Sequence, residues 1–108
     1  SANARPVVSA LSSVNPRIFV SSGHTHRNRR HTLAGGITYT EVGATSDYPG
    51  VWAGYEVSET TIRQTVRRIA APEALTWTEL TRQALRTVWP RWSQGRLADR
   101  CVDVSFDR

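Results

Sequence analysis

The chain has 108 residues and a formal net charge of +5, and all 14 of its basic side chains are arginine. Its length is that of one domain or part of one, and 39% hydrophobic residues with four Trp supply enough apolar material for a core. The single cysteine excludes an internal disulfide and a multi-cysteine zinc site, and no apolar run approaches the ~20 residues of a membrane span.

The first part of the chain predicts one short helix and two strands. Apolar residues at helical spacing predict a helix within residues 1–16, which Pro16 ends. The brief apolar run in 17–22 predicts a strand that is buried on both faces. β-Branched and aromatic residues predict a second strand over 37–42.

The middle of the chain predicts a β-hairpin. Residues 51–57 alternate between the two faces, as a strand does. Residues 60–69 are ambiguous, because their apolar positions recur at helical spacing although most of these residues are β-branched. We favour a strand here, paired with 51–57 through a turn at Ser58 and Glu59.

The last third predicts one amphipathic helix and a terminal strand. Thr76 and Glu79 form a capping-box pattern, and Pro90 follows, so the helix is expected over 76–89. Its apolar stripe consists of Trp77, Leu80, Ala84 and Val88. Alternation over 101–106 predicts a strand in which Cys101 is a small buried residue.

Two of the three histidines lie in Gly23-His24-Thr25-His26, directly after the first predicted strand. On an extended backbone, residues i and i+2 project to the same side about 6.6 Å apart, so both imidazoles can converge on a metal ion. Gly23 is expected to let the backbone turn at the carboxyl end of the strand, where α/β sheets bind ligands. The alternative interpretation is a solvated pair of loop histidines.

The segment Ile18-Phe19-Val20-Ser21-Ser22-Gly23-His24-Thr25-His26-Arg27-Asn28 resembles the last signature of the calcineurin-like metallophosphoesterases, a Gly-His-x-His that follows a hydrophobic strand. Residues 42–52 look like the strands that follow this motif in bacterial members. The resemblance implies a mixed α/β (α+β) fold, the C-terminal part of a β-sandwich flanked by helices. It also implies two divalent or trivalent transition-metal ions (Mn, Fe or Zn), with His24 a ligand of one and His26 a ligand of the other.

The other signatures of this family do not occur in the chain. They are Asp-x-His, Gly-Asp-x-x-Asp and Gly-Asn-His followed by Asp or Glu, and the chain also has no initiator Met. We therefore expect residues 1–108 to be a single segment, the C-terminal portion of a larger phosphoesterase domain. The remainder of the same polypeptide is expected to supply the other metal ligands, and these 108 residues alone are expected to be inactive and to hold no catalytic residue beyond the two ligands.

The residues just after the motif are candidate contacts to the phosphate of a phosphate-ester substrate. They are Arg27, Asn28 and Arg30. The planar fork of arginine suits phosphate, but a solvated basic loop is an equal alternative for the arginines, and for Asn28 we favour a role in shaping the turn over a ligand contact. His31 lies outside the motif and is expected to be a surface residue.

The sequence thus supports two functional hypotheses. The first is a metal-dependent phosphoesterase that hydrolyses phosphate mono- or diesters at a two-metal centre. The second is a small basic module that binds a polyanion or nucleic acid through its arginines. We rank it second, because the arginines are dispersed and form no basic tail.

Overall fold

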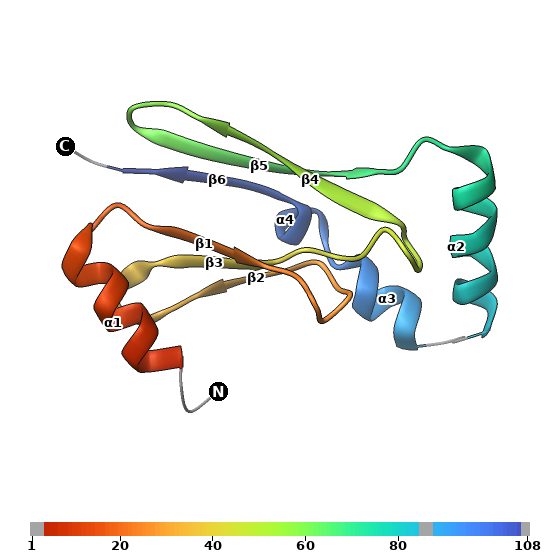
Figure 1. Cartoon of the computed structure of the whole chain (residues 1–108), viewed down its shortest axis with the longest axis horizontal. Coiled ribbons are helices and arrows are strands. Elements are labelled where there is room, and N and C mark those ends of the chain that lie inside the picture. The colour runs from red at the N-terminus through yellow and green to blue at the C-terminus, as the bar shows by residue number, and fades with distance from the viewer. Residues whose placement is uncertain (1–3, 85–87, 107–108) are drawn as a thin grey trace.

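Two three-stranded sheets form the centre of the molecule (Figure 1), and the computed structural model describes residues 4–84 and 88–106. In the first sheet, with strand order β1-β3-β2, β1 is parallel to β3 and β2 is antiparallel to it. The second sheet is antiparallel, with strand order β4-β5-β6. The strands are β1 (Phe19–Ser22), β2 (Arg29–Thr32), β3 (Thr38–Glu41), β4 (Val51–Val57), β5 (Thr61–Arg68) and β6 (Cys101–Ser105).

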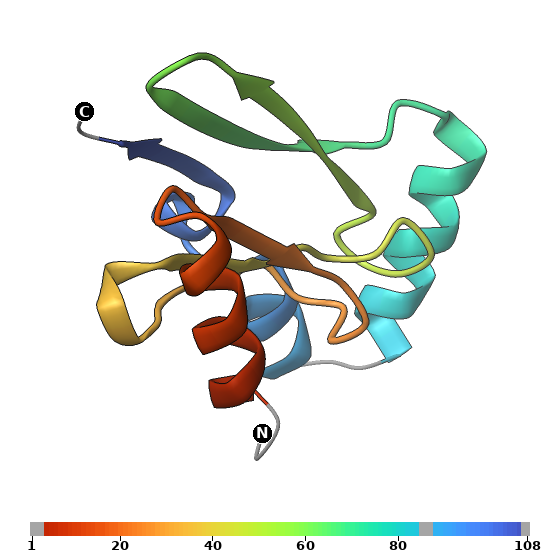
Figure 2. The same ribbon diagram turned by 60° about the vertical axis from the view of Figure 1, so that its left-hand side comes forward.

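Helices lie around these sheets, so the fold is mixed α and β, as the sequence predicts. They are α1 (Ala4–Val14), the 3-10 turn η1 (Ala34–Gly36), α2 (Pro72–Ala84), α3 (Val88–Gln94) and α4 (Leu97–Arg100). In Figure 1, α1 and α2 lie at opposite ends of the molecule and α3 and α4 lie between them, and the turned view in Figure 2 brings α1 to the front. Within the described ranges, no helix is both long and apolar enough to cross a membrane.

Polar side chains join the two sheets. Thr40 in β3 and Gln64 in β5 are both fully buried, and the Thr40 hydroxyl donates to Gln64 Oε1 at 2.7 Å. Next to this pair, on the neighbouring strands β1 and β4, the Ser21 and Tyr55 hydroxyls lie 2.8 Å apart, and Phe19 meets Tyr55 edge to face. The sheets therefore face each other across an interior in which hydrogen bonds replace much of the usual apolar packing.

The apolar core is small. Among the described residues, the buried hydrophobic side chains are Ile37, Val51 and Val102. Large exposed hydrophobic side chains are Val7, Leu11, Val14, Trp52, Tyr55, Val57, Trp77, Leu80, Val88, Trp92 and Leu97. The radius of gyration is 15.5 Å, compared with roughly 13 Å for a compact domain of this length. The chain therefore covers little of its apolar surface by itself.

Most of the predicted strands are confirmed. The hairpin pairs β4 with β5 from Val51↔Arg68 to Val57↔Ile62, so the ambiguous segment is a strand. At its turn the N–H of Ser58 donates to the carbonyl of Thr61 at 2.9 Å. The N-terminal helix and the strands within 37–42 and 101–106 are also confirmed, with ends no more than three residues from the predicted ones.

The predicted helix over 76–89 is wrong in its bounds. Helix α2 begins at Pro72, because proline suits the first helical position, and Thr76 lies inside it, where its hydroxyl donates to the Pro72 carbonyl. Residues 85–87 of the prediction lie outside the described residues. Pro90 does not end a helix but lies in the first turn of α3, where its missing N–H costs nothing. The predicted stripe is largely exposed.

Three further expectations are corrected. The basic segment Arg29–Thr32 is strand β2, although it has no apolar alternation, because it pairs with β3 at the edge of the sheet. Strand β1 is half-buried and not buried on both faces, because it is the other edge strand. Cys101 begins β6 but is exposed.

Candidate metal and phosphate site

The two motif histidines lie in the loop that follows β1. Strand β1 ends at Ser22, and both His24 (φ 77°) and His26 (φ 57°) have left-handed backbone conformations. Gly23 does not, so the histidines and not the glycine make the turn. The expectation of two side chains on one face of an extended strand is therefore wrong. In the described part of the chain no other non-glycine residue has a positive φ, a conformation that is uncommon outside functional and turn positions.

His26 is oriented by a carboxylate. Its Nδ1 lies 2.8 Å from Oδ2 of Asp47, which belongs to the loop between β3 and β4. When Nδ1 carries the proton, its N–H donates a hydrogen bond to the Asp47 carboxylate, and the lone pair of the neutral ring is on Nε2. A histidine held in this way by a carboxylate is typical of metal ligands. The His26 side chain is 43% exposed, so its free edge is open to a ligand.

His24 is exposed, and within the described residues its ring makes no hydrogen bond. No group of three or more His, Cys, Asp or Glu side chains in the same part of the chain is arranged to hold a metal ion. The structure thus provides two imidazoles in one loop and one carboxylate that is already paired with His26. This donor set fits part of a metal centre and not a whole one.

Glu41, the last residue of β3, connects Arg27 with His31. Glu41 is buried, with 4% of its surface exposed. Its carboxylate accepts hydrogen bonds from Arg27 Nε (3.1 Å) and Nη2 (3.3 Å) and lies 2.7 Å from His31 Nε2. Burial raises the pKa of Glu41, but the hydrogen bonds from His31 and Arg27 outweigh it and hold this pKa below its usual value. His31 also stacks on Tyr39 at 5.4 Å and is only half-exposed. It is therefore a paired residue rather than a free surface histidine.

Arg27 is held on two sides. In addition to its ion pair with Glu41, its guanidinium lies 4.7 Å from the centre of the Trp92 ring in α3. Trp89 packs against the same ring at 4.8 Å. The Nη1 group of Arg27 makes no hydrogen bond within the described ranges and can donate to an anion.

Asn28 is buried, with 1% of its surface exposed, and its side chain is fully used inside the protein. Its Oδ1 accepts from the N–H of Gly43 at 2.9 Å, and its Nδ2 donates to the carbonyls of Ser93 and Gln94. These bonds join the β1–β2 loop to α3 and to the segment after β3. Asn28 therefore has a structural role, and we do not include it among the proposed phosphate contacts.

Arg30 lies in β2 and its side chain is exposed, whereas its backbone N–H donates to Asp99 Oδ1 at 3.0 Å. Asp99 also accepts from the N–H of Arg96 at 2.9 Å. Burial raises the pKa of Asp99, but these backbone hydrogen bonds from Arg30 and Arg96 outweigh it and lower the pKa overall. The Asp99 carboxylate thus fixes β2 against the start of α4.

Comparisons with family models, with curated proteins and with solved structures give no match to this chain. The functional assignment therefore depends on the motif and on the contacts described above.

Sequence reasoning missed three residues of this region. Asp47 lies in a stretch of turn-forming residues, and its separation from His26 along the sequence gives no sign that the two side chains meet. Glu41 was treated as part of a strand, although a carboxylate at the end of a strand, opposite a basic segment, is a usable signal. Nothing in the sequence indicates the contact of Trp92 with Arg27.

Proposed function

We propose that this chain contributes two metal ligands, His24 and His26, to a metal-dependent phosphoesterase that hydrolyses phosphate mono- or diesters with a two-metal centre. The observation that carries the proposal is the 2.8 Å contact between His26 Nδ1 and Asp47 Oδ2. It fixes the ring orientation and leaves Nε2 for a metal ion. His24, exposed in the same loop, supplies the second imidazole.

A pair of Mn, Fe or Zn ions would activate water for attack and neutralise the phosphoryl oxygens of the ester. The chain's own residues would hold the metal ions and orient the ester. His24 and His26 would bind the ions, and Asp47 positions the His26 ring. Arg27 is fixed by Glu41 and Trp92 and would direct its remaining Nη1 donor to a phosphate oxygen. Arg30 is an exposed second cation close by in sequence.

The bridging carboxylate and the other ligands are proposed to come from further polypeptide. Two observations support this step. The described residues hold no group of three metal-binding side chains, and eleven large hydrophobic side chains are exposed on a chain with a small apolar core. Both a metal centre and a core of ordinary size would be completed by the same additional segment.

The test is hydrolysis of p-nitrophenyl phosphate and bis(p-nitrophenyl) phosphate by the complete gene product with added Mn²⁺ or Zn²⁺. We expect His24→Ala and His26→Ala each to lower turnover by at least ~100-fold, since a first ligand matters more than the 10–100-fold typical of groups that orient ligands. Asp47→Asn should lower metal affinity by about 10–100-fold. His31→Ala is the matched control and should have a mild effect.

Equal and small effects at all three histidines would contradict the proposal. The rival hypothesis, a basic polyanion-binding module, predicts a different pattern. It predicts no metal-dependent hydrolysis, together with binding to a polyanion that weakens steeply as salt is raised.

A further inference from the structure

The loop that carries Asp47 connects β3 with β4 and contains two backbone hydrogen bonds. The N–H of Val51 donates to the carbonyl of Ala44 at 2.9 Å, and the N–H of Gly50 donates to the carbonyl of Asp47 at 2.6 Å. Both bonds join residues of this one segment. They therefore set the shape of the loop, whereas its position against the rest of the molecule depends on other contacts.

Two side chains of helix α2 bind the backbone on either side of Asp47. The ring N–H of Trp77 donates to the carbonyl of Ser46 at 2.8 Å. The backbone N–H of Tyr48 donates to the hydroxyl of Thr81, also at 2.8 Å. Because Trp77 and Thr81 are four positions apart, they lie on one face of the helix. Asp47 thus lies between two hydrogen bonds to the same helix.

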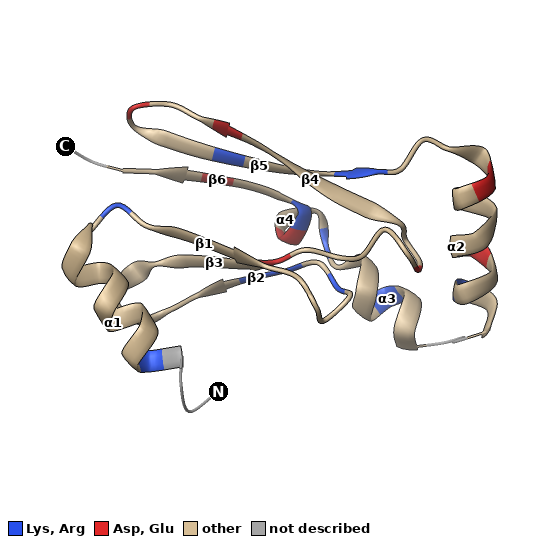
Figure 3. Cartoon of the chain, in the orientation of Figure 1, with Lys and Arg blue, Asp and Glu red and all other residues tan. Residues whose placement is uncertain are grey.

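The contact between α2 and this loop is close. The Thr81 hydroxyl donates to the carbonyl of Thr78 at 2.7 Å, so the same oxygen has a lone pair left to accept the N–H of Tyr48. A Cβ atom on Gly50 would come within 2.7 Å of the Thr78 methyl carbon. The Arg82 guanidinium lies 5.9 Å from the centre of the Tyr48 ring, and Figure 3 shows basic residues on α2 and at the adjoining end of β5.

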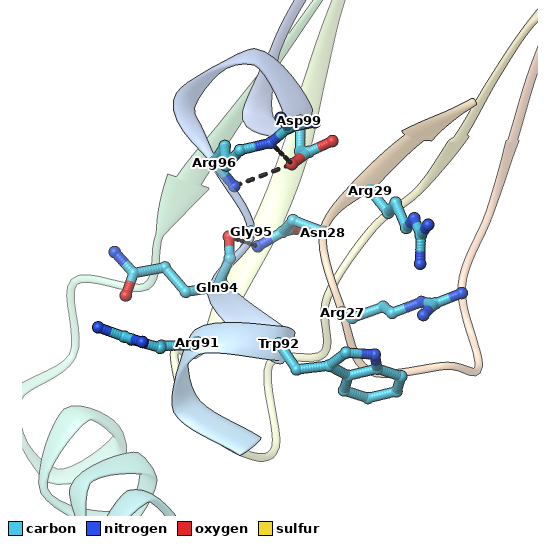
Figure 4. A pocket seen from close by; sticks show the side chains of 9 residues that line it. All are labelled: Arg27, Asn28, Arg29, Arg91, Trp92, Gln94, Gly95, Arg96 and Asp99. Atoms are coloured by element: carbon cyan, nitrogen blue, oxygen red, sulfur yellow. Dashed lines mark hydrogen bonds and ion pairs between the residues drawn. The ribbon is translucent and has the colours of Figure 1, made fainter. Parts of the chain in front are cut away.

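The histidine loop is anchored separately at its other end. There the N–H of Asn28 donates to the carbonyl of Ser93 at 2.9 Å. Figure 4 shows Asn28 next to Gly95, where any side chain would collide with the Asn28 carbonyl. Within the described residues, the one hydrogen-bond partner of the His26 ring is Asp47. The orientation of this ring therefore depends on where Asp47 lies.

We infer that Trp77 and Thr81 are positioning residues for His26, the proposed metal ligand. They fix the backbone on both sides of Asp47, and Asp47 holds the His26 ring with its lone pair on Nε2. Asp47 Oδ1 is buried and has no hydrogen-bond partner among the described residues, so the place of the carboxylate follows from its backbone. Helix α2, at one end of the molecule in Figure 1, thus sets the geometry of the histidine loop. The use of this geometry in catalysis rests on the proposed function.

The test is the tautomer of His26 in the metal-free chain. It is read from the ring nitrogen shifts in ¹H–¹⁵N NMR spectra at about pH 9, where an imidazole with the ordinary pKa of about 6.5 is neutral. We expect the Nδ1–H form to dominate in the parent. The ratio of this form to the Nε2–H form should fall by about twofold to tenfold in Thr81→Val and in Trp77→Phe, as loss of one ordinary hydrogen bond allows. Asp47→Ala gives the limit, because no carboxylate remains at that position.

Thr76→Val and Trp52→Phe are the matched controls. The Thr76 hydroxyl donates to the carbonyl of Pro72 within α2 and does not reach the loop. Trp52 is exposed on β4, and its ring N–H has no hydrogen bond in the described part of the chain. Both control variants should keep the parent ratio of tautomers.

Three results would overturn the inference: a dominant Nε2–H form in the parent, an unchanged ratio in both Thr81→Val and Trp77→Phe, or equal changes in the controls. A lower urea midpoint with an unchanged ratio would also overturn it, because α2 would then only stabilise the fold. The measurement uses no metal. Its failure is therefore distinguishable from failure of the proposed function, which would appear as absence of metal binding by His24 and His26 whatever the tautomer.

Discussion

Asn28→Ala tests how the site is held together. The substitution removes three side-chain hydrogen bonds, to the N–H of Gly43 and to the carbonyls of Ser93 and Gln94. The Ser93 carbonyl keeps a partner, because it still accepts from the backbone N–H of residue 28. Two part-buried groups, the Gly43 N–H and the Gln94 carbonyl, are left unpaired. Since each such group costs about 1–3 kcal/mol, we expect the free energy of unfolding to fall by about 3 kcal/mol.

The assay is urea unfolding followed by circular dichroism. With a denaturant slope of about 1.5 kcal/mol per molar, typical of a small protein, the midpoint should fall by about 2 M. Asn15→Ala is the matched control, because Asn15 is exposed and its side chain accepts a single hydrogen bond, from the N–H of Arg17. That variant should lose no more than about 0.5 kcal/mol. Similar midpoints for the two variants would refute the structural role of Asn28.

Three further predictions concern the surroundings of the site. Glu41 and Asp99 have lowered pKa values, so their stabilising contribution is present above the ordinary carboxyl pKa of about 4 and is lost as pH falls through the lowered values. The urea midpoint should therefore be lower at pH 3 than at pH 7, and this difference should be smaller in Glu41→Gln. Equal midpoints at the two pH values would contradict this. Gly95→Ala should destabilise far more than Gly35→Ala, measured by thermal unfolding. Both glycines have positive φ, but only at Gly95 would the new Cβ meet the Asn28 backbone; equal losses would count against that contact. The exposed Cys101 thiol should react with Ellman's reagent in the folded protein, whereas reaction only after unfolding would contradict its exposure.

Local pattern was a good guide where pairing is also local. The β4–β5 hairpin is such a case, because β-branched residues and a short turn at Ser58 specify it within one stretch of sequence. The strand ahead of the histidine motif was also predictable from its apolar run. Its burial was not, because whether a strand is central or at the edge depends on which strands join the sheet later in the chain.

Other features depend on tertiary contacts that sequence pattern does not encode. Strand β2 consists of Arg29, Arg30, His31 and Thr32, and it exists because β3 offers an edge to pair with. The contact of His26 with Asp47 joins residues in different loops, and its geometry follows from left-handed backbone at the histidines rather than from strand periodicity. The motif thus points to the loop on which the functional hypothesis rests, but not to how its side chains are held.

The most direct test of the central claim is NMR of the histidine rings during titration with Mn²⁺, since a paramagnetic ion broadens the signals of groups that bind it even weakly. We predict that substoichiometric Mn²⁺ broadens the ring signals of His24 and His26 before that of His31, which is occupied by Glu41. The selective broadening should disappear in His24→Ala and in His26→Ala and persist in His31→Ala. Uniform broadening of the three histidines, or selective broadening that survives loss of His24 and of His26, would contradict the assignment of these two residues as metal ligands.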